Sequence, residues 1–388
     1  MYQLVLIILC SSLLLILHTY LFYPLGMTLF FSKSKNKTAE FSSLDECPAV
    51  VVLIAAYNEE DVIERKIRSV YGSLYPSAKL NVYVGSDAST DATNNIVETL
   101  CREFKSLKLV HFPGRVGKIG IVNHLQSLVN EPVLVLTDAN VIFEQHTLFE
   151  LVRKFKDDRV GLVAANIVKE SFDNGGISLQ EKKYLSLENR IKASESNAFN
   201  LIMGAEGGCY AVRNHLFTKV PSDFIVDDFF ITMKVLEKGK YVVFNSTALC
   251  KEDVSGDMIG EYRRKVRISS GNFQNLVYFR NKLFQFWTPL SFAFLSHKVL
   301  RWFTPLLLFI ALLSTAFLMP YGMFFICFFV LQLMGMFSPV ADYFLKFKLP
   351  FLKFVSHFYL MNFALLEGFI KFVSGVKTNI WEPVKRNV

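Results

Sequence analysis

The chain has 388 residues, of which 52% are hydrophobic and 38 are Phe, and it carries a formal net charge of +8. This composition, with a positive mean hydropathy, excludes an ordinary soluble protein. The basic residues cluster beside apolar segments and no nucleic-acid-binding motif is present, so anionic lipid explains the charge better than nucleic acid. The six cysteines are scattered without a Cys-x-x-Cys pair, which argues against a zinc site or a disulfide framework.

The first segment, residues 1–31, contains no Lys, Arg, Asp or Glu and exceeds the roughly 20 residues that span a bilayer. It lacks the basic start and the small-residue cleavage site of a signal peptide, so we expect an uncleaved membrane anchor. A polar linker follows at 32–48. Its lysines place the end of the anchor on the cytoplasmic side, together with the domain at 49–275, because basic residues favour that side.

Between residues 49 and 139, apolar runs that predict buried strands alternate with segments of helical periodicity. This alternation predicts a parallel sheet with right-handed crossovers, in which ligands bind beyond the carboxyl ends of the strands. The expected strands are 49–57, 81–87, 107–112 and 132–139, and the expected helices are 59–71, 91–104 and 117–129.

Polar clusters follow the first two of these strands. In IAAYNEE (54–60), Asn58 and Glu59 offer an amide and a carboxylate to ribose hydroxyls or a uracil edge, although both residues also suit a helix cap. In SDASTDAT (86–93), Asp87 comes at the strand end, while Asp91 is better placed to cap the next helix.

Two more polar clusters follow the third and fourth expected strands, at the same carboxyl edge of the predicted sheet. In GRVGKIGIVN (114–123), Lys118 opens a helix where a bound anion is favoured, whereas Arg115 fits a solvated loop better. In LVLTDAN (134–140), Asp138 ends an apolar strand with a carboxylate, and Asn140 adds an amide. An isolated acid at this position commonly caps a turn, but its three polar companions favour a ligand site.

Taken in order, these clusters resemble the family 2 glycosyltransferases, particularly the membrane-bound branch of cellulose, hyaluronan and poly-N-acetylglucosamine synthases. The resemblance covers roughly residues 49–275, and the flanking membrane segments match in order. It implies an α/β domain of the A-type glycosyltransferase fold, a Rossmann-like nucleotide-diphospho-sugar transferase, together with transmembrane α-helices. It also implies a bacterial inner membrane as the location, with the catalytic domain in the cytoplasm.

The resemblance assigns the clusters to a UDP-sugar donor and a divalent cation, Mg²⁺ or Mn²⁺. The family usually has Asp-x-Asp where this chain has Asp138 and Asn140, and one carboxylate suffices in principle because magnesium often takes only one or two. Asp138 is therefore the expected metal ligand. The expected donor-binding residues are Ala55, Tyr57, Asn58, Glu59, Asp87, Lys118, Asp138, Asn140 and Arg264.

The segment FIVDDFFITMKVLEKGKYVVF (224–244) resembles the acidic pair of the family, which is followed by a helix, a glycine and a strand. By this resemblance Asp228 is the general base and Asp227 supports it; two adjacent carboxylates repel, which raises one pKa. Acids at a helix N-terminus are also favoured by the dipole alone. The glycine-rich segment before it resembles the acceptor side, with Glu206, Gly207 and Gly208 as contacts.

In EYRRKVRISSG (261–271), processive members of the family carry Gln-x-x-Arg-Trp, and the aligned residues here are Arg264, Arg267 and Ile268. Arg267 can neutralise the leaving diphosphate. A basic face held to anionic lipid is the alternative, and Arg264 fits it better than Arg267 does. The missing Trp puts processive extension in doubt.

Beyond the domain, the apolar runs 302–319 and 322–341 can each span the bilayer. Residues 354–373 are interrupted by polar side chains, so they either span or lie in the interface. The expected segments are interfacial helices at 276–300, a transmembrane region of two or three helices at 301–375 and a basic tail at 376–388.

These observations predict an inverting transferase that moves a hexose or N-acetylhexosamine from a UDP-sugar to a growing polysaccharide, in contact with membrane lipids. Two alternatives stay open. The chain could add a single sugar to a lipid or lipid-linked acceptor, or it could be a catalytically silent membrane partner of a glycan synthase.

Overall fold

The computed structural model describes residues 1–31, 38–170, 177–253 and 258–375. The chain divides into two compact units. The sheet unit is formed by Met27–Gly256, and the helical unit by Met1–Gly26 together with Asp257–Val376. This division falls inside the predicted 49–275 domain, and the assignment of residues 257–275 to a cytoplasmic domain stays a prediction.

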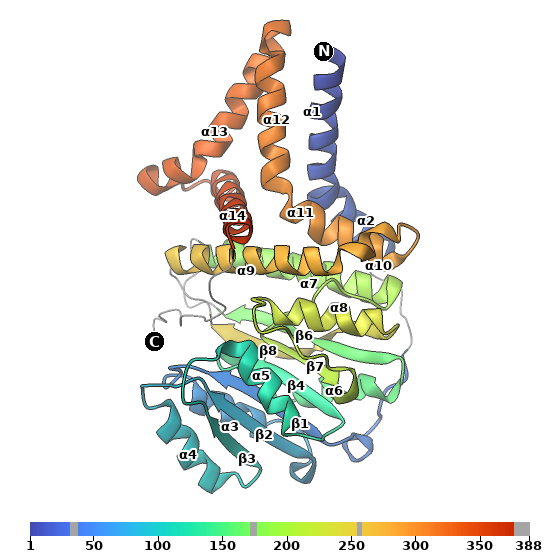
Figure 1. The fold of residues 1–388 in the computed structure, drawn as a ribbon, viewed down its shortest axis with the longest axis vertical. Helices are drawn as coiled ribbons and strands as arrows, with labels where there is room; N and C mark the ends of the chain where they lie inside the picture. The colour runs from blue at the N-terminus through green and yellow to red at the C-terminus, as the bar shows by residue number, and fades with distance from the viewer. Residues whose placement is uncertain (32–37, 171–176, 254–257, 376–388) are drawn as a thin grey trace. The chain divides into compact units, whose positions relative to one another are not determined.

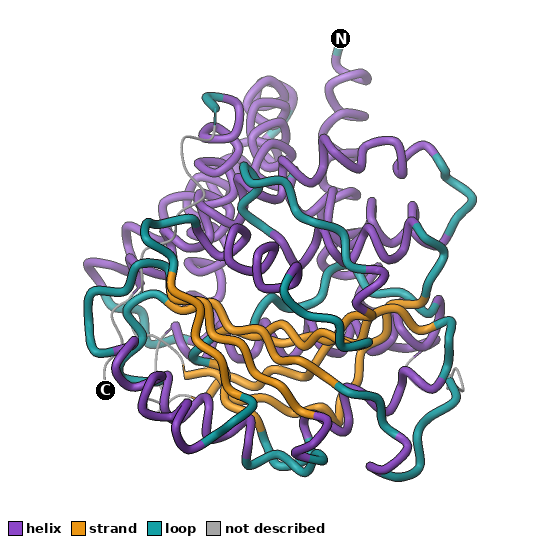
Figure 2. The backbone as a smooth tube through the Cα atoms, turned by 60° about the horizontal axis from the view of Figure 1, so that its bottom comes forward, coloured by secondary structure: helices purple, strands orange, loops and turns teal. Residues whose placement is uncertain are grey.

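The sheet unit contains one sheet with the strand order β3-β2-β1-β4-β7-β6-β8-β5, a continuous layer in Figure 2. The pairs β1–β2, β2–β3 and β1–β4 are parallel, as the sequence predicts for residues 49–139. Beyond β4 the sheet is mixed, because β7 runs antiparallel to both β4 and β6, and β5 runs antiparallel to β8. The strands are β1 Val50–Ala56, β2 Leu80–Ser86, β3 Leu107–His111, β4 Val133–Asp138, β5 Val141–Phe143, β6 Val160–Glu170, β7 Cys209–Arg213 and β8 Tyr241–Asp253.

Helices pack on the sheet through alternate strand residues, as the period of two in a strand requires. Val50, Val52 and Ile54 of β1 share one apolar core with residues of α3, α4 and α6. Gly85 of β2 packs against Ile121 of α5. The helices of this unit are α3 Ile63–Tyr71, α4 Thr93–Glu103, α5 Gly117–Ser127, α6 Thr147–Val152, α7 Ile177–Phe199 and α8 Asp227–Glu237; α2, Tyr23–Phe31, crosses into it from the helical unit.

The register of the parallel strands places their carboxyl ends side by side at one edge of the sheet. Ala55 of β1 pairs with Gly85 on one side and with Asp138 on the other. The backbone N–H of Asp87 donates to the carbonyl of Ala56 at 2.8 Å. The polar clusters that follow β1, β2 and β4 therefore meet at one edge of the sheet, as the parallel arrangement predicts.

The helical unit contains helices that are long and apolar enough to cross a membrane: Tyr2–Phe31, Thr304–Tyr321 and Met323–Leu345. They correspond to the three clearest predicted spans. Leu9 packs with Ala311 and Leu318, so the first helix lies beside α12, as Figure 1 shows. The named helices of this unit are α1 Tyr2–Leu17, α9 Met258–Phe279, α10 Pro289–Ala293, α11 Leu300–Trp302, α12 Thr304–Leu318, α13 Met323–Leu345 and α14 Pro350–Val373.

The segment whose role the sequence leaves open, 354–373, lies in α14. Among the described residues α14 does not qualify as a membrane span by hydropathy and charge. It packs on α9 instead: Ser269 donates to the carbonyl of Leu365 at 2.9 Å, and Tyr262 donates to Glu367 at 2.9 Å. Whether α14 spans the bilayer or lies in the interface stays a prediction.

Candidate active site

The centre of the polar edge is a cluster of three charged side chains around one glycine. Lys118 Nζ lies 2.6 Å from Asp138 Oδ1 and 3.2 Å from the carbonyl oxygen of Gly207. Asp228 faces the same glycine, because a Cβ built on Gly207 would lie 2.6 Å from Asp228 Oδ2 and 3.6 Å from Lys118 Nζ. Residues distant in the sequence thus converge on a single point.

Asp228 lies in the first turn of α8, next to Asp227, and the dipole of the helix favours acids at this end. Burial is the largest effect on its carboxyl group, and together with the charge of Asp227 it raises the pKa of Asp228 to about 7. Glu206 adds to this rise, while Lys118 opposes it. A carboxyl group with such a pKa can accept a proton near neutral pH, as a general base must.

Lys118 lies in the first turn of α5, where its ammonium group faces acids from two elements, β4 and α8. Burial lowers its pKa, but the charges of Asp138, Asp227 and Asp228 outweigh that effect and raise the pKa of Lys118 above its usual value. The ammonium group therefore stays charged and neutralises part of the acid cluster.

Gly207 and Gly208 let the backbone approach this cluster closely. A side chain at position 207 would have to displace the Asp228 carboxylate, which lies 2.6 Å from the Cβ position, and a Cβ at position 208 would lie 2.8 Å from Ile167. The carbonyl of Gly208 accepts hydrogen bonds from the N–H of Asp138 at 3.1 Å and the hydroxyl of Thr137 at 2.9 Å. Glu206 is paired with the buried Lys192 of α7.

Asn58 links the loops that follow β1 and β2. Its φ is 50°, in the left-handed region that Asn tolerates. Its side-chain oxygen accepts from the N–H of Thr90 at 2.9 Å, and its own N–H donates to Ser89 Oγ at 3.2 Å. The cap interpretation of Asn58 is wrong, because α3 begins only at Ile63.

Asp87 is fully buried and accepts hydrogen bonds from the loop before Lys118. It accepts from Arg115 Nε at 2.9 Å and from the N–H groups of Val116 and Gly117 at 2.7 and 3.2 Å. The guanidinium of Arg115 lies 3.3 Å from the centre of the Tyr57 ring. The expectation of a solvated Arg115 is therefore wrong, since this side chain is paired and stacked. The contact of Asp87 with a base stays a prediction.

The residues present fit a divalent cation on Asp138. Its side chain is 39% exposed, and Asn140 donates through Nδ2 to Glu252 at 3.4 Å, which leaves the amide oxygen of Asn140 as a potential ligand. Within the described residues no three His, Cys, Asp or Glu side chains form a metal cluster, so the remaining ligands would be phosphate oxygens and water. Asp227 Oδ2 is buried without a hydrogen-bond partner, which is consistent with a further group at this edge.

Tyr210 is a residue that the sequence interpretation missed. It lies on β7, is fully buried, and its hydroxyl has no hydrogen-bond partner among the described residues. Burial raises the pKa of Tyr210 well above its usual value, and Asp227, Asp228 and Asp138 raise it further. A polar hydroxyl two residues after a pair of glycines, inside an apolar strand, is the signal that could have revealed it.

The two predicted arginines lie in the helical unit, on α9, whereas the acids belong to the sheet unit. Arg264 forms a two-point ion pair with Glu261, with distances of 2.9 and 3.0 Å. Arg267 is half-buried. Their roles at the diphosphate stay predictions.

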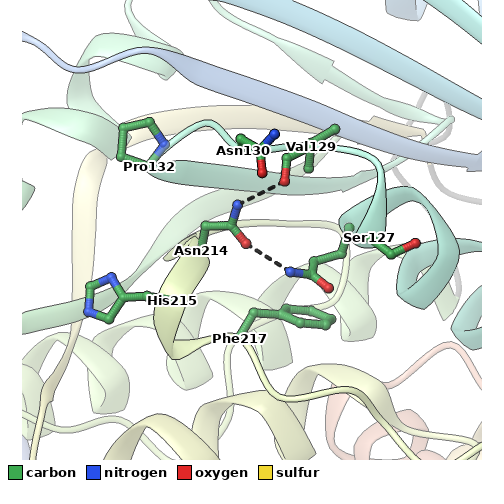
Figure 3. A pocket seen from close by; sticks show the side chains of 8 residues that line it. Ser127, Val129, Asn130, Pro132, Asn214, His215 and Phe217 are labelled. Carbon is green, nitrogen blue, oxygen red and sulfur yellow. Dashed lines mark hydrogen bonds between the residues drawn. The ribbon is translucent and has the colours of Figure 1, made fainter.

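A separate pocket of about 560 Å³ lies at the opposite end of β4, since Pro132 directly precedes that strand. Figure 3 shows that its polar groups bond to one another: Gln126 Nε2 donates to Asn214 Oδ1 at 2.9 Å, and Asn214 Nδ2 donates to the carbonyl of Val129 at 3.3 Å. This pocket is therefore distinct from the acid cluster.

Comparisons with known proteins identify relatives of this chain that are named as sugar transferases or glycan and glycolipid synthases. The profile described as "Glycosyl transferase family 2" matches residues 51–226. A beta-monoglucosyldiacylglycerol synthase of a Nostoc species is 30% identical over 118 residues, which cover 30% of this chain and 25% of that protein. A poly-beta-1,6-N-acetyl-D-glucosamine synthase of Staphylococcus aureus is 25% identical over 283 residues, covering 66% of this chain and 65% of that protein.

Among solved structures, a mannosyltransferase from Pyrobaculum calidifontis, in complex with GDP-mannose and Mn²⁺, is similar to this chain. The TM-score is 0.72 at 20% identity, covering 94% of this chain and 99% of the other. This similarity confirms the predicted fold class. Residues 51–226 therefore match the glycosyl transferase family 2 domain, and the chain combines a GT-A fold with helices that are long and apolar enough to span a membrane.

Proposed function

We propose that the chain is a membrane-bound inverting glycosyltransferase that moves a hexose or an N-acetylhexosamine from a UDP-sugar to a growing glycan. The observation that carries this proposal is the convergence of Asp138, Lys118 and Asp228 on Gly207 at the carboxyl edge of the sheet. It supports the proposal because a nucleotide-sugar reaction needs positive charge at a diphosphate and a base at an acceptor within one site.

In the proposed mechanism Asp228 is the general base. Its carboxylate takes the proton of an acceptor hydroxyl while that oxygen forms a bond to the anomeric carbon. The bond between the anomeric carbon and the diphosphate oxygen breaks on the opposite side, so the configuration inverts and the nucleoside diphosphate leaves with the bonding electrons. The pKa of about 7 suits a base that must be ionised at neutral pH and still accept a proton.

In this proposal Lys118 stabilises the negative charge that develops on the leaving diphosphate, and the resemblance assigns Arg267 the same role. Lys118 supplies a fixed positive charge beside Asp138, at a distance of 2.6 Å. Asp138, with the amide oxygen of Asn140, would hold Mg²⁺ or Mn²⁺, which supplies Lewis-acid stabilisation of the diphosphate when it is bound. Glu206, Gly207 and Gly208 would line the acceptor side.

The donor face would be formed by Tyr57, Asn58 and Glu59 with Asp87. In this proposal Asn58 fixes the two loops to each other, and Asp87 fixes the loop that leads to Lys118. Ala55 lies beside Asp138 in the register of the sheet and would approach the same donor. Arg264, whose side chain is paired with Glu261, is assigned to the donor by the resemblance alone.

The acceptor is a glycan in the preferred version, which the match to poly-N-acetylglucosamine synthases over 66% of the chain favours. Transfer of one sugar to a lipid is the second candidate, favoured by the match to glucosyldiacylglycerol synthases and by Ile268 at the position of the family's Trp. We place the protein in a bacterial inner membrane, with the sheet unit in the cytoplasm.

A donor panel tests the function. Membranes containing the full chain are incubated with UDP-glucose, UDP-N-acetylglucosamine or GDP-mannose, in EDTA or with added Mg²⁺ or Mn²⁺, and nucleotide release and products are measured by mass spectrometry. The proposal predicts metal-dependent release of UDP and a ladder of glycan products. Products carrying one sugar on a lipid would support the second candidate, and no turnover with any donor would support a silent partner of a synthase.

A further inference from the structure

A buried lysine contacts the turn that we propose to hold the divalent cation. Lys66 is in the middle of α3, three residues after Ile63 and four before Val70, and so on the apolar face of that helix. Its side chain is fully buried. A lysine on an apolar helix face normally keeps its ammonium group in water, so a complete burial requires specific partners.

The partners of Lys66 are the two ends of one tight turn. Its Nζ donates to Thr137 Oγ1 at 2.8 Å and to the carbonyl oxygen of Val141. Thr137 is the residue before Asp138, and Val141 is the residue after Asn140. The ammonium group also lies 3.7 Å from the centre of the Phe143 ring. Lys66 therefore bridges the end of β4 and the start of β5, and it closes the turn that carries Asp138 and Asn140.

This arrangement is costly for stability, which indicates that it serves another purpose. The hydrogen bonds of Lys66 go to a hydroxyl and a carbonyl, neither of which carries a compensating charge, and the burial of its charge lowers its pKa to about 8. An apolar side chain of similar length would avoid the cost of burying a charge. The hydrogen bonds of Lys66 restrain the turn. The Thr137 hydroxyl that accepts from Lys66 also donates to the carbonyl of Gly208 at 2.9 Å.

We propose that Lys66 is a positioning residue, which holds the turn 137–141 so that Asp138 and Asn140 present their oxygens to a divalent cation. Fixing both ends of the turn leaves its two central residues little freedom, and metal sites need their ligands held by such supporting contacts. Glu252 adds a weaker restraint through its 3.4 Å contact with Asn140 Nδ2. The inference rests on the proposed metal-dependent function but concerns a residue that does not touch the metal.

The test compares Lys66→Met with Lys79→Met in the purified full chain. Lys79 is the control, because its Nζ also bridges two points of the chain, here the backbone carbonyls of Asp45 and Cys47 at 2.6 and 2.8 Å, away from the carboxyl edge of the sheet. Amide hydrogen exchange of the metal-free protein is measured for residues 137–143. Binding of Mn²⁺ in the presence of UDP is measured by electron paramagnetic resonance of the free ion.

For Lys66→Met we expect about tenfold faster exchange in this turn and a dissociation constant for Mn²⁺ raised about tenfold, the range seen when supporting residues of metal sites are removed. For Lys79→Met we expect neither change. If Lys66→Met does not fold, Lys66→Gln, which keeps a donor but no charge, carries the same comparison. Unchanged exchange and unchanged Mn²⁺ binding in the folded variant would overturn the inference.

The two proposals fail in different ways. Wild-type protein that binds Mn²⁺ with UDP but transfers no sugar would contradict the proposed function, while the exchange and binding comparison would still decide the role of Lys66. Wild-type protein that binds no Mn²⁺ would contradict both.

Discussion

Asp228 has neighbours that act on its proton affinity in opposite directions. Burial, Asp227 and Glu206 favour the protonated form, and Lys118 favours the carboxylate. The result is a pKa of about 7, so small changes in the surrounding charge alter the fraction of active base at physiological pH.

A first prediction concerns this balance. Glu206→Gln removes one of the anions that raise the pKa of Asp228, so that pKa falls and the acidic limb of the pH–rate profile moves to lower pH. The measurement is kcat/KM for the donor between pH 5 and 9. Glu98→Gln, an exposed acid on α4, is the control and leaves the limb in place. A limb that moves to higher pH in Glu206→Gln would contradict the assignment.

A second prediction concerns the metal ligand. Asp138→Ala lowers turnover by on the order of 100-fold, because the cation loses its one carboxylate and the stabilisation it supplies is worth several kcal/mol. Asn140→Asp introduces the second carboxylate that the family usually has. This variant keeps its activity or changes its preference between Mg²⁺ and Mn²⁺. Metal titrations of both variants measure this. Full activity of Asp138→Ala at the wild-type metal concentration would exclude Asp138 as the ligand.

The sequence predicts the acidic residues of the site but not the buried side chains that contact or surround them. Asp138 and Asp228 follow recognisable patterns, a strand end and a helix start. Lys66 and Tyr210 do not, because their importance depends on burial beside residues more than 60 positions away or in other strands. The sequence does not reveal the pairing of Arg115 for the same reason, since its partner Asp87 lies 28 residues earlier.

Among the elements, the glycine-rich segment before β7 lies directly against the charged side chains of the site. It passes between the acids of α8 and the lysine of α5, and its carbonyls bond to both Lys118 and Asp138. The backbone itself therefore forms part of the wall of the site.

A third prediction follows from this approach. Gly207→Ala places a methyl group 2.6 Å from Asp228 Oδ2, so the base must move and turnover falls by about 100-fold, as expected for a misplacement of about 1 Å. Gly26→Ala is the control, because nothing lies within 4 Å of its Cβ position. Thermal unfolding of both variants separates a folding defect from a site defect. Equal turnover of Gly207→Ala and wild type would show that Asp228 has room to move.

The parallel half of the sheet was predictable, since its strands alternate with helices along the chain. The other half was not, because β7 inserts between β4 and β6 in the opposite direction, and β8 pairs with both β6 and β5. Such long-range pairings leave no local periodicity. The short strand β5 is only three residues long and was therefore invisible as a separate element.

For the whole molecule, the order of helices and sheet predicts a topology. If Tyr2–Phe31 and the pair Thr304–Tyr321 and Met323–Leu345 cross the membrane, the turn at Tyr321 lies on the opposite side from the sheet unit. The basic residues that follow the first and third spans favour the cytoplasm for their side.

A fourth prediction tests this topology in intact cells with a membrane-impermeant maleimide. In a chain with Cys10 and Cys327 changed to Ser, Tyr321→Cys is labelled from outside, whereas Ser77→Cys in the sheet unit is labelled only after permeabilisation. Labelling of Ser77→Cys in intact cells would contradict a cytoplasmic sheet unit.

The most direct measurement of the central claim is the initial rate of UDP release from a UDP-sugar by membranes containing Asp228→Asn, compared with wild type and with Asp223→Asn, an exposed acid in the loop before α8. An amide keeps the shape of the side chain but cannot take the acceptor's proton. The account predicts metal-dependent release by wild type and by Asp223→Asn, and none above background by Asp228→Asn. Equal rates for Asp228→Asn and wild type would contradict it.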